Sequence, residues 1–281
     1  LRLGYAHSFD AGGSYTLKFA VRIKDEYETT HKFASGVALD VSGYEYANSD
    51  FVKFKVSGGG QVVNVEVTYT AQFPKGVGDS ASSPVMCYTY SEFKYAMENE
   101  DIRYVTLGNV NETMPVGEEG LVTAIHVNGI KNLHLLGDAT FTAPVSDITT
   151  YAALLHTQQN DTLNVTGSGS LKFRAVANNS YNAVIYNQGG MVNIDNGTLV
   201  GSYNTAVYGM AIWQEYGELR ILGGQLFAEN ALSPRELPIS KTAVNIVGGK
   251  AWLQGGTFKT ENVINTIDLP YGLDIGQNAT V

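Results

Sequence analysis

The 281-residue sequence is poor in cysteine, in charged residues and in long hydrophobic runs. Its single cysteine, Cys87, excludes a disulfide within the chain and a zinc site built from thiolates. We expect Cys87 to be a buried packing residue. No apolar run reaches about 18 residues, so we predict no membrane-spanning helix in this chain.

Charged residues make up only 16% of the chain, and the net charge is −9. Nucleic acids and anionic membranes both bind clustered Lys and Arg, so neither is an expected partner. The sequence also lacks a phosphate-binding loop, a dinucleotide-binding glycine pattern and a nucleophile elbow, and we predict no cofactor and no metal ion. Low charge with 31 glycines and 17 tyrosines is typical of an extracellular β-rich protein.

What the sequence does contain is a repeat, between about residues 121 and 260. Alanine followed by an aliphatic residue recurs at intervals of 29, 30, 28 and 32 residues: Ala124-Ile125, Ala153-Leu154, Ala183-Val184, Ala211-Ile212 and Ala243-Val244. A second alternating run follows each pair, at 133–135, 163–165, 192–194, 219–221 and 251–253. A glycine, a polar residue and an apolar residue then follow at 169–171, 197–199, 224–226 and 256–258.

Three short strands in a period of this length predict one coil of a parallel β-helix per repeat, with about five regular coils. Alternation along each strand turns one face inward, so the apolar positions of successive coils should stack. One predicted inward column is Leu133, Leu163, Val192, Leu219 and Ala251. The alternative is an antiparallel sandwich of hairpins, although hairpins need not keep three apolar columns aligned over five repeats.

The rest of the chain is assigned to flanking elements. We predict a small β-sandwich-like module at residues 1–75. The composition of residues 76–88 indicates a linker. We expect residues 89–281 to form the β-helix, with an amphipathic helix at 91–100 that begins at Ser91 and covers the first coil. Residues 261–281 are predicted to cap the last coil or to lead into a further module. Because residue 1 is Leu, we interpret the chain as a fragment of a longer protein.

Two motifs carry a resemblance to known families. Residues 9–17, Phe-Asp-Ala-Gly-Gly-Ser-Tyr-Thr-Leu, resemble a motif in repeated modules of Gram-positive surface proteins. The strand-Gly-Gly-strand pattern at 221–226 and 253–258 is similar to that of bacterial adhesins. Residues 89–260 as a whole resemble the right-handed parallel β-helix of the pectate-lyase-like superfamily. This resemblance implies a fold that carries polysaccharide lyases, glycoside hydrolases, adhesins and inert stalks alike.

The resemblance to lyases and hydrolases implies acids on neighbouring coils that hold Ca²⁺ or act in pairs. The predicted outward columns of the second strand contain one acid, Asp195, which we expect to form a surface ion pair with Arg220. Glu215 and Glu218 flank one turn and are expected to be solvated. His126 and His156 lie at different offsets in consecutive coils, so we predict that they do not face each other. No catalytic residue is assigned, although the loop at 230–241 could complete a site.

The remaining signal is aromatic. Trp213, Tyr216, Tyr186 and Trp252 lie on or beside outward positions, and exposed aromatic rings can stack on sugars. An apolar outward column is expected to be either covered or part of a binding face: His126, Leu155, Ile185, Trp213 and Asn245.

These observations lead to one function hypothesis and two alternatives. The hypothesis is a non-catalytic, monomeric, extracellular or cell-surface bacterial fragment, adhesin-like, that binds a host or dietary glycan or a surface protein. The alternatives are a polysaccharide lyase or glycoside hydrolase of this fold, and a passive stalk.

Overall fold

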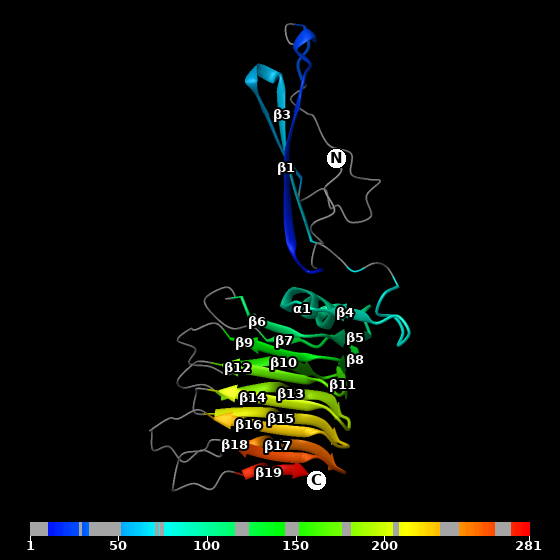
Figure 1. Cartoon of the computed structure of the whole chain (residues 1–281), viewed down its shortest axis with the longest axis vertical. Helices are drawn as coiled ribbons and strands as arrows, with labels where there is room; N and C mark the ends of the chain where they lie inside the picture. The colour runs from blue at the N-terminus through cyan, green and yellow to red at the C-terminus, as the bar shows by residue number, and fades with distance from the viewer. Residues whose placement is uncertain are drawn as a thin grey trace. The chain divides into compact units, whose positions relative to one another are not determined.

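The computed structural model describes residues 11–27, 30–33, 52–70, 73, 76–115, 124–143, 152–175, 181–204, 208–230, 242–261 and 271–281. The chain divides into two compact units, Leu1–Pro74 and Lys75–Val281. The predicted fold class is confirmed, because the described residues of the second unit form a parallel β-helix with a single α-helix (Figure 1). None of the helices in the described ranges is long and apolar enough to cross a membrane.

The described part of the first unit is a small antiparallel sheet. Its strands are β1 (Ser14–Arg22), β2 (Val52–Ser57) and β3 (Val62–Thr70), in the order β1-β3-β2. A short 3₁₀ turn, Asp25–Tyr27, follows β1, and the turn Gly58–Gly60 joins β2 to β3. Gly59 and Gly60 have φ of 68° and 97°, a backbone conformation that glycine adopts readily in a turn.

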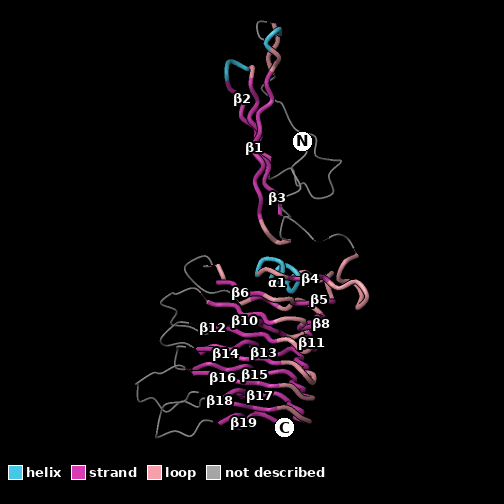
Figure 2. Tube along the Cα trace, viewed as in Figure 1, coloured by secondary structure: helices cyan, strands magenta, loops and turns pink. Residues whose placement is uncertain are grey.

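The β-helix has two parallel sheets, visible as stacked coils in Figure 2. The larger sheet holds β4 (Val85–Cys87), β5 (Tyr104–Leu107), β7 (Ile125–His126), β8 (Ile130–Leu135), β10 (Ala152–Gln158), β11 (Thr162–Gly167), β13 (Tyr181–Ile194), β15 (Tyr208–Ile221), β17 (Thr242–Leu253) and β19 (Tyr271–Thr280). The smaller sheet holds the last strand of each coil: β6 (Val110–Thr113), β9 (Asp138–Thr142), β12 (Ser170–Ala175), β14 (Leu199–Asn204), β16 (Gln225–Asn230) and β18 (Thr257–Glu261).

In the later coils the first two predicted strands form one long bent strand. β13 and β15 each run for 14 residues through glycine-containing corners. Gly217 in one such corner has a φ of +87°, and a Cβ added there would lie 2.2 Å from the Gly190 oxygen. Only glycine lets adjacent corners approach this closely. The ladder pairing of β13 with β15 is interrupted at this corner, between Gln188 and Met191.

The stacking of the second strand differs from the predicted columns by two residues in the first regular coil. Leu133 pairs with Val165, and Leu163 pairs with Lys131. Lys131 therefore occupies an inward position, where it is fully buried in the same column as Leu163 and Val192. The apolar columns of all three strands are otherwise as buried as predicted through most of the stack.

Helix α1 (Tyr90–Glu98) lies across the N-terminal end of the coils, which confirms the predicted cap (Figure 1). It begins earlier than predicted, because the N-cap is Thr89: the Glu92 N–H donates to the Thr89 hydroxyl at 3.2 Å. The Glu92 carboxylate in turn accepts from the Tyr88 N–H at 2.8 Å, a variant of the capping box. Phe93 is fully buried and stacks on Phe141 of β9, with 5.4 Å between ring centroids.

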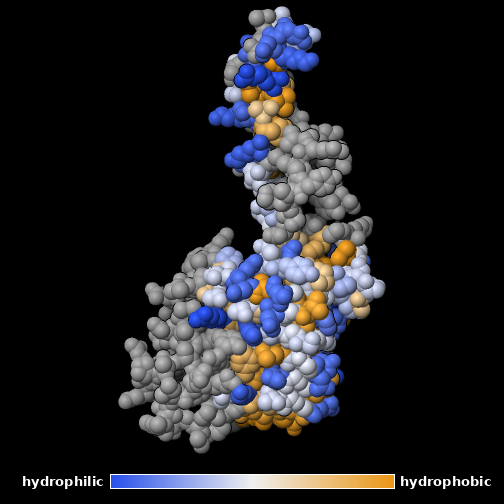
Figure 3. Space-filling view, in the orientation of Figure 1, coloured by the Kyte–Doolittle hydropathy of each residue, from blue (hydrophilic) through white to orange (hydrophobic). Residues whose placement is uncertain are grey.

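The segments on either side of the predicted β-helix also join the stack. β4 falls within the predicted linker at 76–88 and pairs in parallel with β5, so this part of the segment belongs to the solenoid. Cys87 of β4 is fully buried, as predicted, and burial raises the pKa of its thiol. At the other end, β19 pairs in parallel with β17 and adds one further rung. Figure 3 shows apolar surface at this C-terminal end, where Val247 and Ile275 are exposed.

Candidate functional site

Four aromatic rings on consecutive coils form a column on the outer side of the first strands: His126, His156, Tyr186 and Trp213. The two histidine rings meet edge to face, and the other neighbouring rings stack. The centroid separations are 5.9 Å between the two histidines, 5.0 Å from His156 to Tyr186 and 4.7 Å from Tyr186 to Trp213. The prediction that His126 and His156 do not face each other is wrong, because the two residues pair directly in the sheet. Leu155 and Ile185 are not in this column but in the buried one beside it.

This stacking decides what Tyr186 and Trp213 can bind. Tyr186 lies between His156 and Trp213, nearly parallel to the first and inclined by 28° to the second. Both faces of the Tyr186 ring and one face of the Trp213 ring are therefore in contact with other rings. A sugar stacks on the face of an aromatic ring, so these two half-buried residues are poor platforms for it. We interpret the column as a stabilising ladder.

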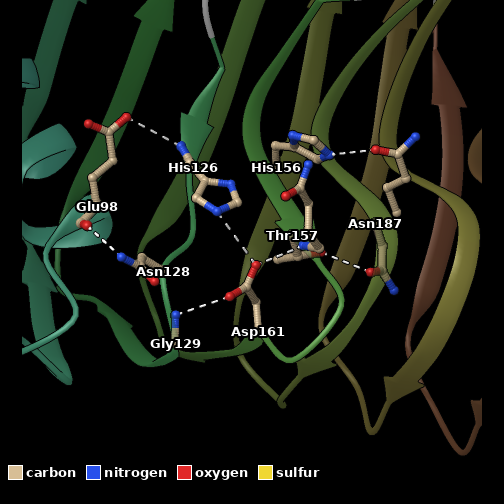
Figure 4. Close-up of polar contacts among 10 residues, drawn as sticks. Glu98, His126, Asn128, Gly129, His156, Thr157, Asp161 and Asn187 are labelled. Carbon is tan, nitrogen blue, oxygen red and sulfur yellow. Dashed lines mark hydrogen bonds and ion pairs between the residues drawn. The ribbon is translucent and has the colours of Figure 1, made fainter.

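Polar side chains bind the edges of the column (Figure 4). The Asp161 carboxylate accepts hydrogen bonds from the N–H groups of Gly129 and Gln158 and lies 3.9 Å from His126 Nε2. Gln188 donates its amide to Glu215 at 3.1 Å, so its oxygen faces His156 and accepts from Nε2–H at 3.2 Å. Burial lowers the pKa of His156, and the hydrogen bond with Gln188 offsets only part of this effect.

A second ladder, of buried polar side chains, lies inside the corner next to the column. The Thr157 hydroxyl donates to the Asn187 oxygen at 2.9 Å, and the Asn187 amide donates to the backbone oxygens of Gly190 and Glu218. Gln214 donates in the same way to Gly248 and Lys250. These bonds satisfy carbonyl groups that the bent strands leave without a ladder partner, so the role of this ladder is structural.

The better candidate for a binding site is a groove on the second strands, with a volume of about 600 Å³, a size typical of ligand sites. It crosses β11, β13, β15 and β17, and it is lined by Asn164, Val165, Thr166, Asn193, Ile194, Asp195, Arg220, Leu222, Trp252 and Gln254. Trp252 is 39% exposed, and the Arg220 guanidinium covers one of its faces, 4.9 Å from the ring centroid.

Two of the polar residues that line the groove, Asn164 and Asn193, belong to a column of asparagines on consecutive second strands. Asn132, Asn164 and Asn193 form an amide ladder: Asn164 donates to Asn132 at 3.0 Å and Asn193 donates to Asn164 at 2.7 Å. The predicted ion pair between Asp195 and Arg220 is absent from the described residues. Arg220 pairs in the sheet with Asn193, and its guanidinium lies 3.4 Å from the Glu218 carboxylate.

The structure separates the four predicted ligand-binding residues. Trp252 lines the groove, Tyr186 and Trp213 lie in the ring column, and Tyr216 is 58% exposed at a corner and does not line the groove. Sequence reasoning gave no binding role to Asn164, Asn193 or Gln254. Their signal was present, because polar residues recurred at outward positions of the second strand.

The acids of the described residues do not converge in the groove. Asp195 is the one carboxylate in its lining, and no group of three His, Cys, Asp or Glu residues in the described ranges is arranged to hold a metal ion. Glu215 accepts hydrogen bonds from Tyr186 and Gln188, and Glu218 pairs with Arg220. Most of the loop at 230–241 lies outside the described residues.

The groove therefore offers one aromatic face, several amide and hydroxyl groups, one carboxylate and one guanidinium to a ligand. In comparisons with known proteins, the chain matches no family model, no curated protein and no solved structure.

Proposed function

We propose that the chain is a non-catalytic, extracellular part of a bacterial surface protein, adhesin-like, whose β-helix presents a glycan-binding groove. The observation that carries this proposal is the groove lined by Trp252 and by polar side chains from four consecutive coils. The resemblance to adhesins and to the pectate-lyase-like superfamily supports it, as does the low content of charged residues.

The chemistry of the lining matches that of sugars. A pyranose ring has an apolar face that packs on Trp, and hydroxyl groups that both donate and accept hydrogen bonds. Amide and hydroxyl side chains such as Asn193, Thr166 and Gln254 can pair with hydroxyls of either polarity. A partly exposed Trp beside such groups is the usual composition of a site where one ring provides most of the binding energy.

The test is a panel of immobilised polysaccharides, measured with and without Ca²⁺, in which binding and product release are read in the same wells. We expect binding without turnover, and a loss of at least about tenfold in affinity for Trp252→Ala. Tyr216→Ala is the matched control, since it removes an exposed aromatic ring outside the groove and should leave binding unchanged.

The other outcomes identify the alternatives. Release of unsaturated or reducing ends would show a polysaccharide lyase or glycoside hydrolase and would overturn the non-catalytic proposal. An absence of both binding and turnover across the panel would contradict a glycan-binding function and favour a passive stalk. Equal loss of binding in both variants would place the site elsewhere on the surface.

A further inference from the structure

We infer that the groove is built for a neutral sugar chain, and not for a uronate or another anionic glycan. This inference rests on the proposed function and specifies the class of ligand for the same groove. It follows from the charges, the hydrogen-bond polarity and the length of the lining.

The charges of the lining leave no cation free for an anionic ligand. Arg220 is the one basic residue among the ten that line the groove. Its Nη2 lies 3.4 Å from Glu218 Oε2, and its guanidinium plane is held over the Trp252 ring. A ligand carboxylate would have to compete with Glu218 for Arg220, and it would also lie in the same groove as the Asp195 carboxylate. Like charges in such a groove disfavour anions.

The hydrogen-bond polarity of the groove points to ligand hydroxyls as donors. In the Asn ladder, Asn164 donates to Asn132 and Asn193 donates to Asn164, so each amide donates to the preceding coil. The last acceptor of the ladder is therefore the side-chain oxygen of Asn193, which pairs in the sheet with Arg220. Asp195 adds an exposed carboxylate, of which one oxygen accepts from the Asn196 N–H. Sugar hydroxyls can donate to these oxygens, whereas carboxylate or sulfate groups have no proton to donate.

The length of the lining suits a chain and not a single sugar. The groove crosses four consecutive coils, and neighbouring strands of a sheet are about 4.8 Å apart. A chain that lies along the stack would therefore pass a new set of polar side chains at each coil. Affinity should increase with the number of sugar units until the chain spans the groove.

The experiment is calorimetric titration of the whole chain with two matched sets of oligosaccharides, of increasing length. One set contains neutral gluco-, xylo- and manno-oligosaccharides, and the other contains galacturonate and mannuronate oligomers. We expect neutral oligomers to bind, with an affinity that changes less than about twofold between low and high salt, because screening acts on charged ligands. Asp195→Asn should weaken or preserve this binding.

The uronate set provides the opposing outcome. If uronates bind more tightly than neutral oligomers, lose affinity with salt and gain affinity in Asp195→Asn, the inference is wrong although the groove still binds glycans. Glu66→Gln, in the first unit, is the control for a change of net charge at a residue that does not line the groove. If no oligosaccharide of either set binds, the proposed function itself fails.

Discussion

At the scale of single residues, Lys131 is the least expected feature of the core. It occupies an inward position of β8 and is fully buried, and its ammonium group donates to the backbone oxygens of Asn99 and Ile102. These carbonyls lie in the turn that follows α1, where the Asn99 oxygen also accepts from the Ile102 N–H at 3.1 Å. Burial lowers the pKa of Lys131 from 10.5 to about 8, although Glu100, Asp101 and Asp161 oppose the shift.

The lowered pKa of Lys131 predicts how stability depends on pH. Between pH 8 and 10.5 the unfolded chain holds a proton on this lysine that the folded chain has lost, so stability should rise with pH. Relative to Lys131→Met, the wild-type free energy of unfolding should increase by about 3 kcal/mol across this range. The measurement is urea unfolding of both proteins at several pH values.

The Met variant also loses two hydrogen bonds, which lowers its stability at every pH. The test therefore compares how the free energy of unfolding changes with pH in the two proteins. The difference in this free energy at a single pH does not report the pKa of Lys131. Equal slopes in the two proteins would show that Lys131 keeps an ordinary pKa in the folded chain.

At the scale of elements, α1 seals the N-terminal end of the core, and Phe93 is its main contact. We predict that Phe93→Ala lowers the free energy of unfolding by about 3–5 kcal/mol, because it removes a fully buried ring stacked on Phe141. It should also increase light scattering, since a loosened cap uncovers strand edges that can pair with other chains.

The control for the cap is Lys94→Ala on the same helix. Lys94 forms a partly exposed ion pair with Glu98 one turn later, so its loss should cost no more than about 0.5 kcal/mol. Urea unfolding and light scattering measure both effects. Similar losses in the two variants would mean that α1 contributes through its helical structure and not through the contact of Phe93.

The strands also show which parts of the fold could be predicted from the sequence. The coils were predictable, because inward apolar residues must recur once per coil. The pairing of individual residues was not, since the run Ala152-Ala153-Leu154-Leu155 is apolar throughout and allows the Ala-aliphatic pair to slip by one. That slip hid the pairing of His126 with His156. A lysine is not expected to point inward, so Lys131 shifted the predicted column of the second strand by two.

The candidate site was predictable only in part for a related reason. The sequence marks Trp213 and Trp252 as outward aromatic residues but does not show what covers each ring. In the structure Trp213 stacks on Tyr186, whereas Trp252 meets Arg220 and faces the groove. Whether a ring face is free depends on its neighbours one coil away, and this requires the residue pairing that the sequence left ambiguous.

At the scale of the whole molecule, the second unit is a one-dimensional stack in which each coil contacts its neighbours. We predict that backbone amides of β11, β13 and β15 exchange with deuterium at least about tenfold more slowly than those of β18 and β19, which are the terminal strands of the two sheets within the described residues. Hydrogen exchange read by mass spectrometry checks this gradient. Protection of β19 equal to that of β13 would indicate that the stack opens only as a single cooperative unit.

The corner glycines and the columns of stacked side chains limit which insertions and deletions this molecule can accept in evolution. The coils already differ in length by one to four residues, so an insertion between the paired strands leaves the columns aligned. An insertion of one or two residues within a paired strand would instead displace the columns that pass through it, including the buried amides and the lining of the groove. Duplication or loss of a complete coil would keep all of these alignments and lengthen or shorten the groove by one rung, about 4.8 Å. The number of paired strands should therefore change in whole coils, each of which adds or removes one subsite for the ligand.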